Sequence, residues 1–192
     1  YNSNRVFYHT LEHAENVIQE IYEYYLAFSH PDLLPENDSK SYFASHVIAA
    51  LWHDAVYIVG YPAGMNENLS SYAMIDNLLK IEYTFPLVSD IEKAAQMIKH
   101  TKISNHMSSK QDHAGVDILL DADLASLGKD WDTFLNNNYN ILREHSYNFG
   151  LVSAQALKPQ AEFLKKLMNS RETIYRTKYF IDKYEKQAKM NI

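Results

Sequence analysis

The stretch His46-Val-Ile-Ala-Ala-Leu-Trp-His-Asp-Ala-Val-Tyr57 is largely apolar, yet it carries the adjacent polar pair His53-Asp54. Burial of an imidazole and a carboxylate is costly unless something compensates for it, and a divalent metal would compensate both groups at once. Adjacent residues on a helix point about 100° apart, so further ligands must come from other parts of the chain. Upstream and downstream candidates are His9, His13, Asp121 and Asp123.

Two histidines with two carboxylates suit Mn, Fe, Co, Ni or Zn, and the order of affinities does not choose among these metals. The alternative for His53-Asp54 is a hydrogen-bonded pair inside a core. The alternative for Asp121 and Asp123 is helix capping or solvation.

Outward from this stretch, apolar residues recur at helical spacing and no segment alternates with period two. The first predicted helix starts after Thr10, a possible N-cap, and continues to about Phe28. The next two predicted helices are about Ser41–Tyr57 and Glu67–Lys80. A fourth opens at the capping box Ser89-x-x-Glu92 and ends near His100, and a fifth carries Asp121-Ala-Asp-Leu-Ala-Ser-Leu-Gly128. The remaining predicted helices are about 130–147, 153–168 and 170–190.

These helices predict an all-α bundle. Its 192 residues suit a single domain over 1–192, with a core at about 8–130 and C-terminal helices at about 130–190.

Composition narrows the class of protein. Hydrophobic residues make up 46% of the chain and charged residues 22%, which is an ordinary globular balance. The net charge of −6 argues against a binder of long nucleic acids, although local cations could still hold a small phosphorylated substrate. The sequence shows no signal segment, no membrane-length apolar run and no Cys. We therefore expect a cytoplasmic protein without membrane contact; the oligomeric state is open.

His9-Thr-Leu-Glu-His13 also matches H-x-x-E-H, the inverzincin motif, in which two histidines bind zinc and the glutamate acts as base. Five residues match often by chance, and an exposed helix start is the plain alternative. His100, His106 and His113 lie in or beside a polar stretch and are expected at the surface.

The chain thus presents His13-x-x-x-Val17, then His53-Asp54, then Ala122-Asp123-Leu124. This order resembles the HD superfamily of metal-dependent phosphohydrolases. The resemblance implies an HD-domain-like helical bundle in which four residues bind the metal: His13, His53, Asp54 and Asp123.

A longer resemblance, to a bacterial family of predicted HD phosphohydrolases, covers nearly the whole chain. Its pieces are Tyr8-His9-x-x-x-His13, Trp52-His-Asp-Ala-Val-Tyr57, Asn66-Glu67-x-x-Ser70, Leu120-Asp-Ala-Asp-Leu-Ala-Ser-Leu-Gly128, Arg143-Glu144, and Ile174-Tyr-Arg-Thr177 with Glu185-x-x-Ala188-x-x-Asn191. Two positions depart from the family pattern. The histidine after Thr101 is displaced to His106, and Arg5 lies three residues before Tyr8 rather than two.

The resemblance implies hydrolysis of a small phosphate ester, such as a nucleotide, by metal-activated water. Asp123 or Glu67 would take the proton of the water, and His9 would donate to the phosphate or the leaving group. Substrate contacts are expected from Lys102, Arg143 and Asn66, with Glu144 orienting Arg143 and Asp121 in a supporting or capping role. One metal is expected, and a second would need histidines from the interval that holds His106.

Two other classes of function compete with hydrolysis. A non-catalytic module that binds nucleotides or partners would release no phosphate. A metalloprotease would need His9 and His13 together as ligands, with Glu12 as base.

Overall fold

The computed structural model describes residues 6–28, 36–81, 88–108, 115–149 and 153–192, and all regular structure in these ranges is helical. This confirms the predicted all-α class. In chain order the elements are α1 Leu11–Ala27, α2 Glu36–Trp52, α3 Met65–Leu78, α4 Val88–Lys99, α5 Ile103–His106, α6 Val116–Asp123, the 3₁₀ helix η1 Leu124–Gly128, α7 Trp131–Phe149, α8 Ser153–Ser170, α9 Lys178–Phe180, the π-helix η2 Ile181–Glu185 and α10 Lys186–Asn191.

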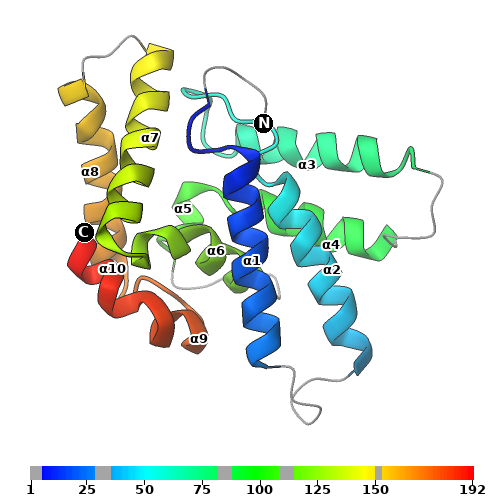
Figure 1. Cartoon of the computed structure of the whole chain (residues 1–192). Helices are drawn as coiled ribbons and strands as arrows, with labels where there is room; N and C mark the ends of the chain where they lie inside the picture. Colours follow the sequence, from blue (N-terminus) through cyan, green and yellow to red (C-terminus); the bar gives the residue numbers. More distant parts are fainter. Residues whose placement is uncertain (1–5, 29–35, 82–87, 109–114, 150–152) are drawn as a thin grey trace.

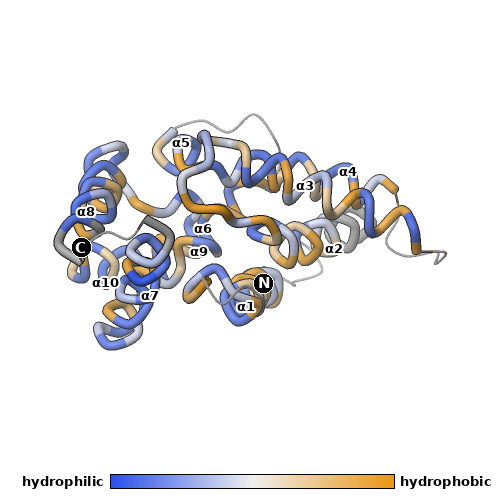
Figure 2. The backbone as a smooth tube through the Cα atoms, turned by 90° about the horizontal axis from the view of Figure 1, so that it is seen from above, coloured by the Kyte–Doolittle hydropathy of each residue, from blue (hydrophilic) through white to orange (hydrophobic). Residues whose placement is uncertain are grey.

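The helices form two groups that meet at α6 (Figure 1). On one side α1 and α2 run antiparallel, α2 packs on α4, and α4 packs on α3. On the other side α7 pairs with α8, while η2 and α10 pack on η1. Hydrophobic and hydrophilic residues both occur along the long helices (Figure 2), as expected for helices packed on one face and exposed on the other. Within the described ranges, no helix has the length and apolar character needed to cross a bilayer.

Small residues let α2 approach its neighbours closely. Ala49 and Ala50 are fully buried and join Ile21 of α1, Ile98 of α4 and Leu120 of α6 in one apolar core. Because an alanine adds only a methyl group to the helix surface, the helices around α2 can approach it closely. This packing holds the end of α2 next to the end of α6.

Helix α2 ends earlier than the predicted Tyr57, at Trp52. Backbone bonds continue to Ala55, and beyond it the chain is held by side chains of α3. Ser70 Oγ accepts from the Val56 N–H at 3.0 Å and donates to the Val56 carbonyl at 3.2 Å. Asn66 bonds both the N–H and the carbonyl of Ile58, at 3.1 and 3.2 Å. The chain therefore turns directly after the His53-Asp54 pair. At its other end α2 begins at Glu36, before the predicted Ser41.

Two other local predictions are wrong. Ser89 is not an N-cap, because α4 already begins at Val88. The predicted helix at 170–190 is interrupted, because the chain stays irregular until α9 begins at Lys178. The Glu185 carboxylate accepts from the N–H groups of Ile174 and Tyr175 at 2.9 to 3.2 Å. This buried acceptor replaces the helical partners that these N–H groups lack.

Candidate metal centre

Four predicted ligands converge from three helices. His13 lies in the first turn of α1, where Thr10 occupies the N-cap position as predicted. His53 and Asp54 follow the last residue of α2, and Asp123 is the last residue of α6. Each of these four side chains offers one ligand atom, and the four atoms lie within 4.8 Å of one another. The cluster can therefore hold a metal ion.

The ring of His53 is fixed in an orientation that suits a ligand. Its Nδ1–H donates to the Ala50 carbonyl at 2.8 Å. In a neutral imidazole the other nitrogen, Nε2, is then a lone-pair acceptor. This atom is buried and has no hydrogen-bond partner, although Asp54 Oδ2 lies 2.9 Å away and Asp123 Oδ1 3.5 Å away. When His53 is neutral, this buried acceptor faces two carboxylates, and a cation between them would satisfy all three groups.

The separations between the donor atoms fit a shared ion. His13 Nε2 lies 3.1 Å from Asp123 Oδ1 and 3.7 Å from Asp54 Oδ2. Ligands about 2.1 Å from a tetrahedral ion are about 3.4 Å apart. The separations to His53, 2.9 and 3.5 Å, bracket the same value. The residues therefore fit a small divalent metal in both donor type and spacing.

Without a cation, the histidine and the carboxylates compensate one another electrostatically. Burial lowers the pKa of His53, but Asp54 and Asp123 outweigh it and raise this pKa well above the ordinary value. Burial raises the pKa of Asp54, but His53 brings it down to about 2. Burial also raises the pKa of Asp123, and its bonds to His13 and His53 reverse this and hold the pKa well below the ordinary value. Both carboxylates are therefore ionised at neutral pH and available to a metal.

His106, which was expected at the surface, is buried beside the cluster. Its Nε2 lies 2.9 Å from the Thr101 carbonyl and 3.5 Å from Asp123 Oδ2. The Nε2 atom therefore carries a proton, which it donates to Thr101, and offers no lone pair to an ion. The helix α5 that holds His106 is fastened by Arg176, whose guanidinium donates to the carbonyls of Asn105 and Ser108.

Sequence reasoning missed both His106 and Arg176 as parts of the site. The four-residue helix α5 carries too little periodicity to predict. The sequence did contain one signal for His106, which is the histidine after Thr101 and is displaced from its place in the family pattern.

His9 lies beside the cluster but is not part of it. Its Nδ1 lies 2.6 Å from Glu144 Oε2, and its ring stacks on Tyr57 with 3.6 Å between the centroids. Burial lowers the pKa of His9, but Asp54 and Glu144 outweigh it and raise this pKa above the ordinary value. The other nitrogen, Nε2, is the ring atom left to exchange a proton.

Glu144 holds the N-terminal segment. Its fully buried carboxylate accepts from the N–H groups of Phe7, Tyr8 and His9 at 2.6 to 2.9 Å. The guanidinium of Arg143 lies over the ring of Phe7, 4.0 Å from its centroid.

Asp121 supports the C-terminal segment and lies outside the ligand cluster. Its carboxylate accepts from the N–H groups of Arg176 and Thr177 at 2.7 to 3.1 Å. Burial raises the pKa of Asp121 to about 7, against the opposing effect of these bonds. Asp121 thus places Arg176, and Arg176 in turn fastens α5.

A cavity of about 450 Å³ opens onto the cluster, where Asp54 and Asp123 line it. His9, Glu67 and Asn66 line the same cavity. Burial, with a smaller contribution from Asp54, raises the pKa of Glu67. The structure therefore brings the two predicted proton carriers, His9 and Glu67, to one space with the candidate ligands.

The two predicted substrate cations are Lys102 and Arg143. Neither Lys102 nor Arg143 is among the described residues that line this cavity. Lys102 is near Glu67, whose pKa its charge lowers slightly against the effect of burial. The side chain of Asn66, though it lines the cavity, is bonded to the backbone of Ile58.

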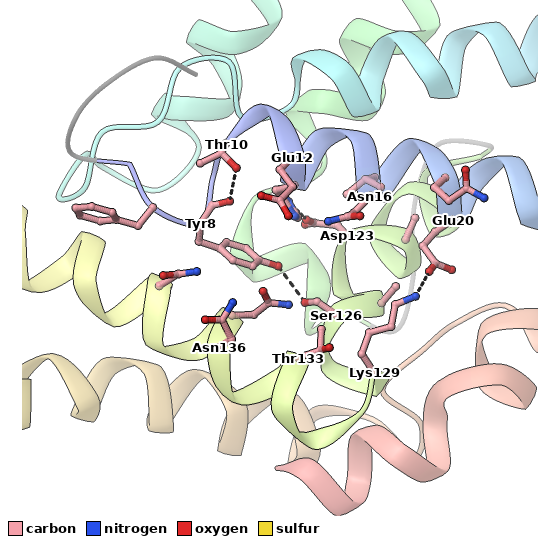
Figure 3. Close-up of a pocket in the computed structure, with 18 of the residues that line it drawn as sticks. Tyr8, Thr10, Glu12, Asn16, Glu20, Asp123, Ser126, Lys129, Thr133 and Asn136 are labelled. Atoms are coloured by element: carbon pink, nitrogen blue, oxygen red, sulfur yellow. Dashed lines mark hydrogen bonds and ion pairs between the residues drawn. The ribbon is translucent and has the colours of Figure 1, made fainter.

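A second cavity, of about 230 Å³, reaches the cluster between α1 and α7. Figure 3 shows its polar lining and the bond between Tyr8 and Ser126, 3.0 Å long. Both of these residues and Asp123 line both cavities, so they form the partition between them. Glu12 lines the second cavity, away from His53 and Asp54.

Comparison with known proteins finds no family model and no curated protein that matches this chain.

Proposed function

We propose that the protein is a metal-dependent phosphohydrolase of the HD type that acts on a small phosphate ester. The observation that carries the proposal is the buried lone pair of His53 Nε2, which faces Asp54 and Asp123 at the floor of a cavity. His13 completes a set of two nitrogens and two carboxylates. This donor set suits Mn, Fe, Co, Ni or Zn.

A divalent ion held there would polarise a phosphoryl oxygen and lower the pKa of water toward neutrality. The chain itself supplies proton transfer. Glu67 lines the cavity with a raised pKa, which makes it a stronger base than an ordinary glutamate. His9 has a raised pKa and is held by Glu144, so its Nε2 can deliver a proton to the leaving group.

One ion suffices for this arrangement. The Nε2 of His106, which faces the cluster, donates to Thr101, while its Nδ1 is buried without a hydrogen-bond partner. The protease alternative is disfavoured by the same contacts. His9, which that mechanism needs as a ligand, is bonded to Glu144, and Glu12 lines the other cavity.

The test is release of inorganic phosphate from 1-naphthyl phosphate by protein reconstituted with Mn²⁺, Fe²⁺, Co²⁺, Ni²⁺ or Zn²⁺. We expect turnover with at least one metal, abolition by a chelator, and no turnover by Asp123→Asn. A folded wild-type protein that binds metal but releases no phosphate from esters would favour the non-catalytic binding module.

A further inference from the structure

The larger cavity is walled by aromatic and aliphatic side chains. Its lining includes Tyr57 and Tyr61 from the turn after α2, Leu124 and Leu127 from η1, and Phe163 from α8. Tyr61 is 44% exposed, so its ring is accessible at the mouth. Walls of this kind accept a flat apolar group and offer few hydrogen bonds to a sugar.

Few positively charged groups serve the same cavity: His9 lines it, and Lys102 lies outside the lining but near Glu67. Among the described residues that line it there is no lysine and no arginine, whereas the carboxylates of Asp54, Glu67 and Asp123 all contribute. Two of these carboxylates would balance the charge of one divalent ion. A phosphate on that ion would then depend on the proton that His9 carries, and a second phosphate would lie among apolar walls and carboxylates. Burial of an unpaired charge is strongly unfavourable.

We infer that the substrate is a monoester of a single phosphate whose leaving group contains a flat aromatic ring, as in an aryl phosphate or a nucleoside monophosphate. This inference rests on the proposed function. It disfavours nucleoside diphosphates and triphosphates, inorganic polyphosphate and small sugar phosphates. The phosphate lies at the ligand cluster, and the aromatic group lies against the wall that includes Tyr61 and Phe163.

The first experiment compares kcat/KM for 1-naphthyl phosphate, AMP, ADP, ATP and glycerol 3-phosphate on the metal-loaded protein. We expect the aromatic monophosphates to exceed ADP, ATP and glycerol 3-phosphate by at least about 10-fold, and the ratio of 1-naphthyl phosphate to AMP distinguishes the two sources of aromatic group. Equal values for AMP and ADP, or for glycerol 3-phosphate and 1-naphthyl phosphate, would overturn the inference.

Tyr61→Ala tests the aromatic wall. Stacking of a base on an aromatic side chain contributes about 1–3 kcal/mol, so kcat/KM for 1-naphthyl phosphate should fall at least about 5-fold. The value for glycerol 3-phosphate should stay within about 2-fold of wild type. Tyr72→Ala is the matched control, because Tyr72 is 62% exposed on α3 and is not in the lining. An equal loss for both substrates would contradict a stacking role.

Ile58→Lys tests the lack of cations by adding one. Ile58 lines the cavity and is 43% exposed, so the fold should tolerate the change. The ratio of ADP to AMP turnover should rise several-fold. Leu79→Lys adds the same charge at a residue that is 58% exposed and outside the lining, and it should leave the ratio unchanged. The same ratio in both variants would count against the inference.

Binding measurements distinguish a failure of this inference from a failure of the proposed function. Naphthylmethylphosphonate and methylphosphonate, neither of which can be hydrolysed, are titrated calorimetrically into the metal-loaded protein. Tighter binding of the naphthyl compound by at least about 5-fold, without phosphate release from esters, would support the aromatic site and refute hydrolysis. Phosphate release with equal affinity for the two phosphonates would support hydrolysis and refute the aromatic site.

Discussion

At the scale of single residues, buried carboxylates hold the irregular parts of the chain in place. Glu144, Asp121 and Glu185 each accept hydrogen bonds from two or three consecutive backbone N–H groups. A carboxylate without such partners would be costly in these surroundings. The first two of these acids lie beside the candidate site, so they determine where its proton carrier and its supporting helix stand.

Glu144→Gln should lower the free energy of unfolding by about 1–3 kcal/mol at pH 6, because the amide offers only one acceptor oxygen to this cluster of donors. Burial raises the pKa of Glu144, but its bond to His9 and the N–H groups outweigh burial and lower this pKa. Its contribution is therefore present above the ordinary glutamate pKa of 4.5 and lost as the pH falls through the folded value.

The contribution of His9 to stability depends on pH with the opposite sign. Because its pKa is raised, its contribution is present below the ordinary value of 6.5 and lost as the pH rises through the folded value. The pair therefore stabilises most between these two limits. Urea unfolding at pH 6 and pH 3.5 checks this, with Glu12→Gln as an exposed control expected to change stability by less than about 0.5 kcal/mol. An equal loss for Glu144→Gln at both pH values would refute the assignment.

His9→Ala separates proton transfer from metal binding. We expect the variant to keep its metal and to lose turnover by about 10²–10⁴-fold, as is typical when a general acid or base is removed. The pH profile should lose the limb that depends on a protonated histidine. A variant that retains wild-type turnover would exclude His9 from catalysis, and steady-state kinetics with 1-naphthyl phosphate decides the matter.

At the scale of helices, hydrophobic periodicity predicted the long helices. It failed at positions where hydrogen bonds between residues distant in sequence determine where a helix ends. The spacing from Leu11 to Phe28, after Thr10, predicts α1 almost to the residue. The same reasoning extends α2 past Trp52 and makes one helix of 170–190, because it cannot foresee that Ser70 or Glu185 will take the backbone bonds. Periodicity also cannot predict that His106 lies close to Asp123, because this proximity depends on how α5 packs.

Arg176→Met should release α5. The side chain is 6% exposed, and its guanidinium donates to three carbonyls of the α5 segment, so its loss should destabilise the protein by about 2–3 kcal/mol. Hydrogen exchange of residues 103–108 should accelerate relative to that of α4. Arg176→Lys keeps the charge and should recover part of the protection. Unchanged exchange in the methionine variant would show that other contacts hold α5.

At the scale of the whole molecule, the candidate site lies where the two groups of helices meet. His13, His53 and Asp54 come from the α1–α2 side, while Asp123 ends the α6 helix between the groups. The resemblance of short motifs predicted this set of four, and the structure brings the four residues together. The lining of the cavity could not be read from the sequence, because Phe163 reaches it from a distant helix.

The most direct test of this account is the metal content of purified, metal-loaded protein, measured by mass spectrometry on wild type, His53→Ala and His9→Ala. We expect about one divalent ion per chain in wild type and in His9→Ala, and less than about a tenth of that in His53→Ala. Circular dichroism confirms that each variant is folded. Full metal retention by folded His53→Ala, or loss of metal from folded His9→Ala, would contradict the proposed centre.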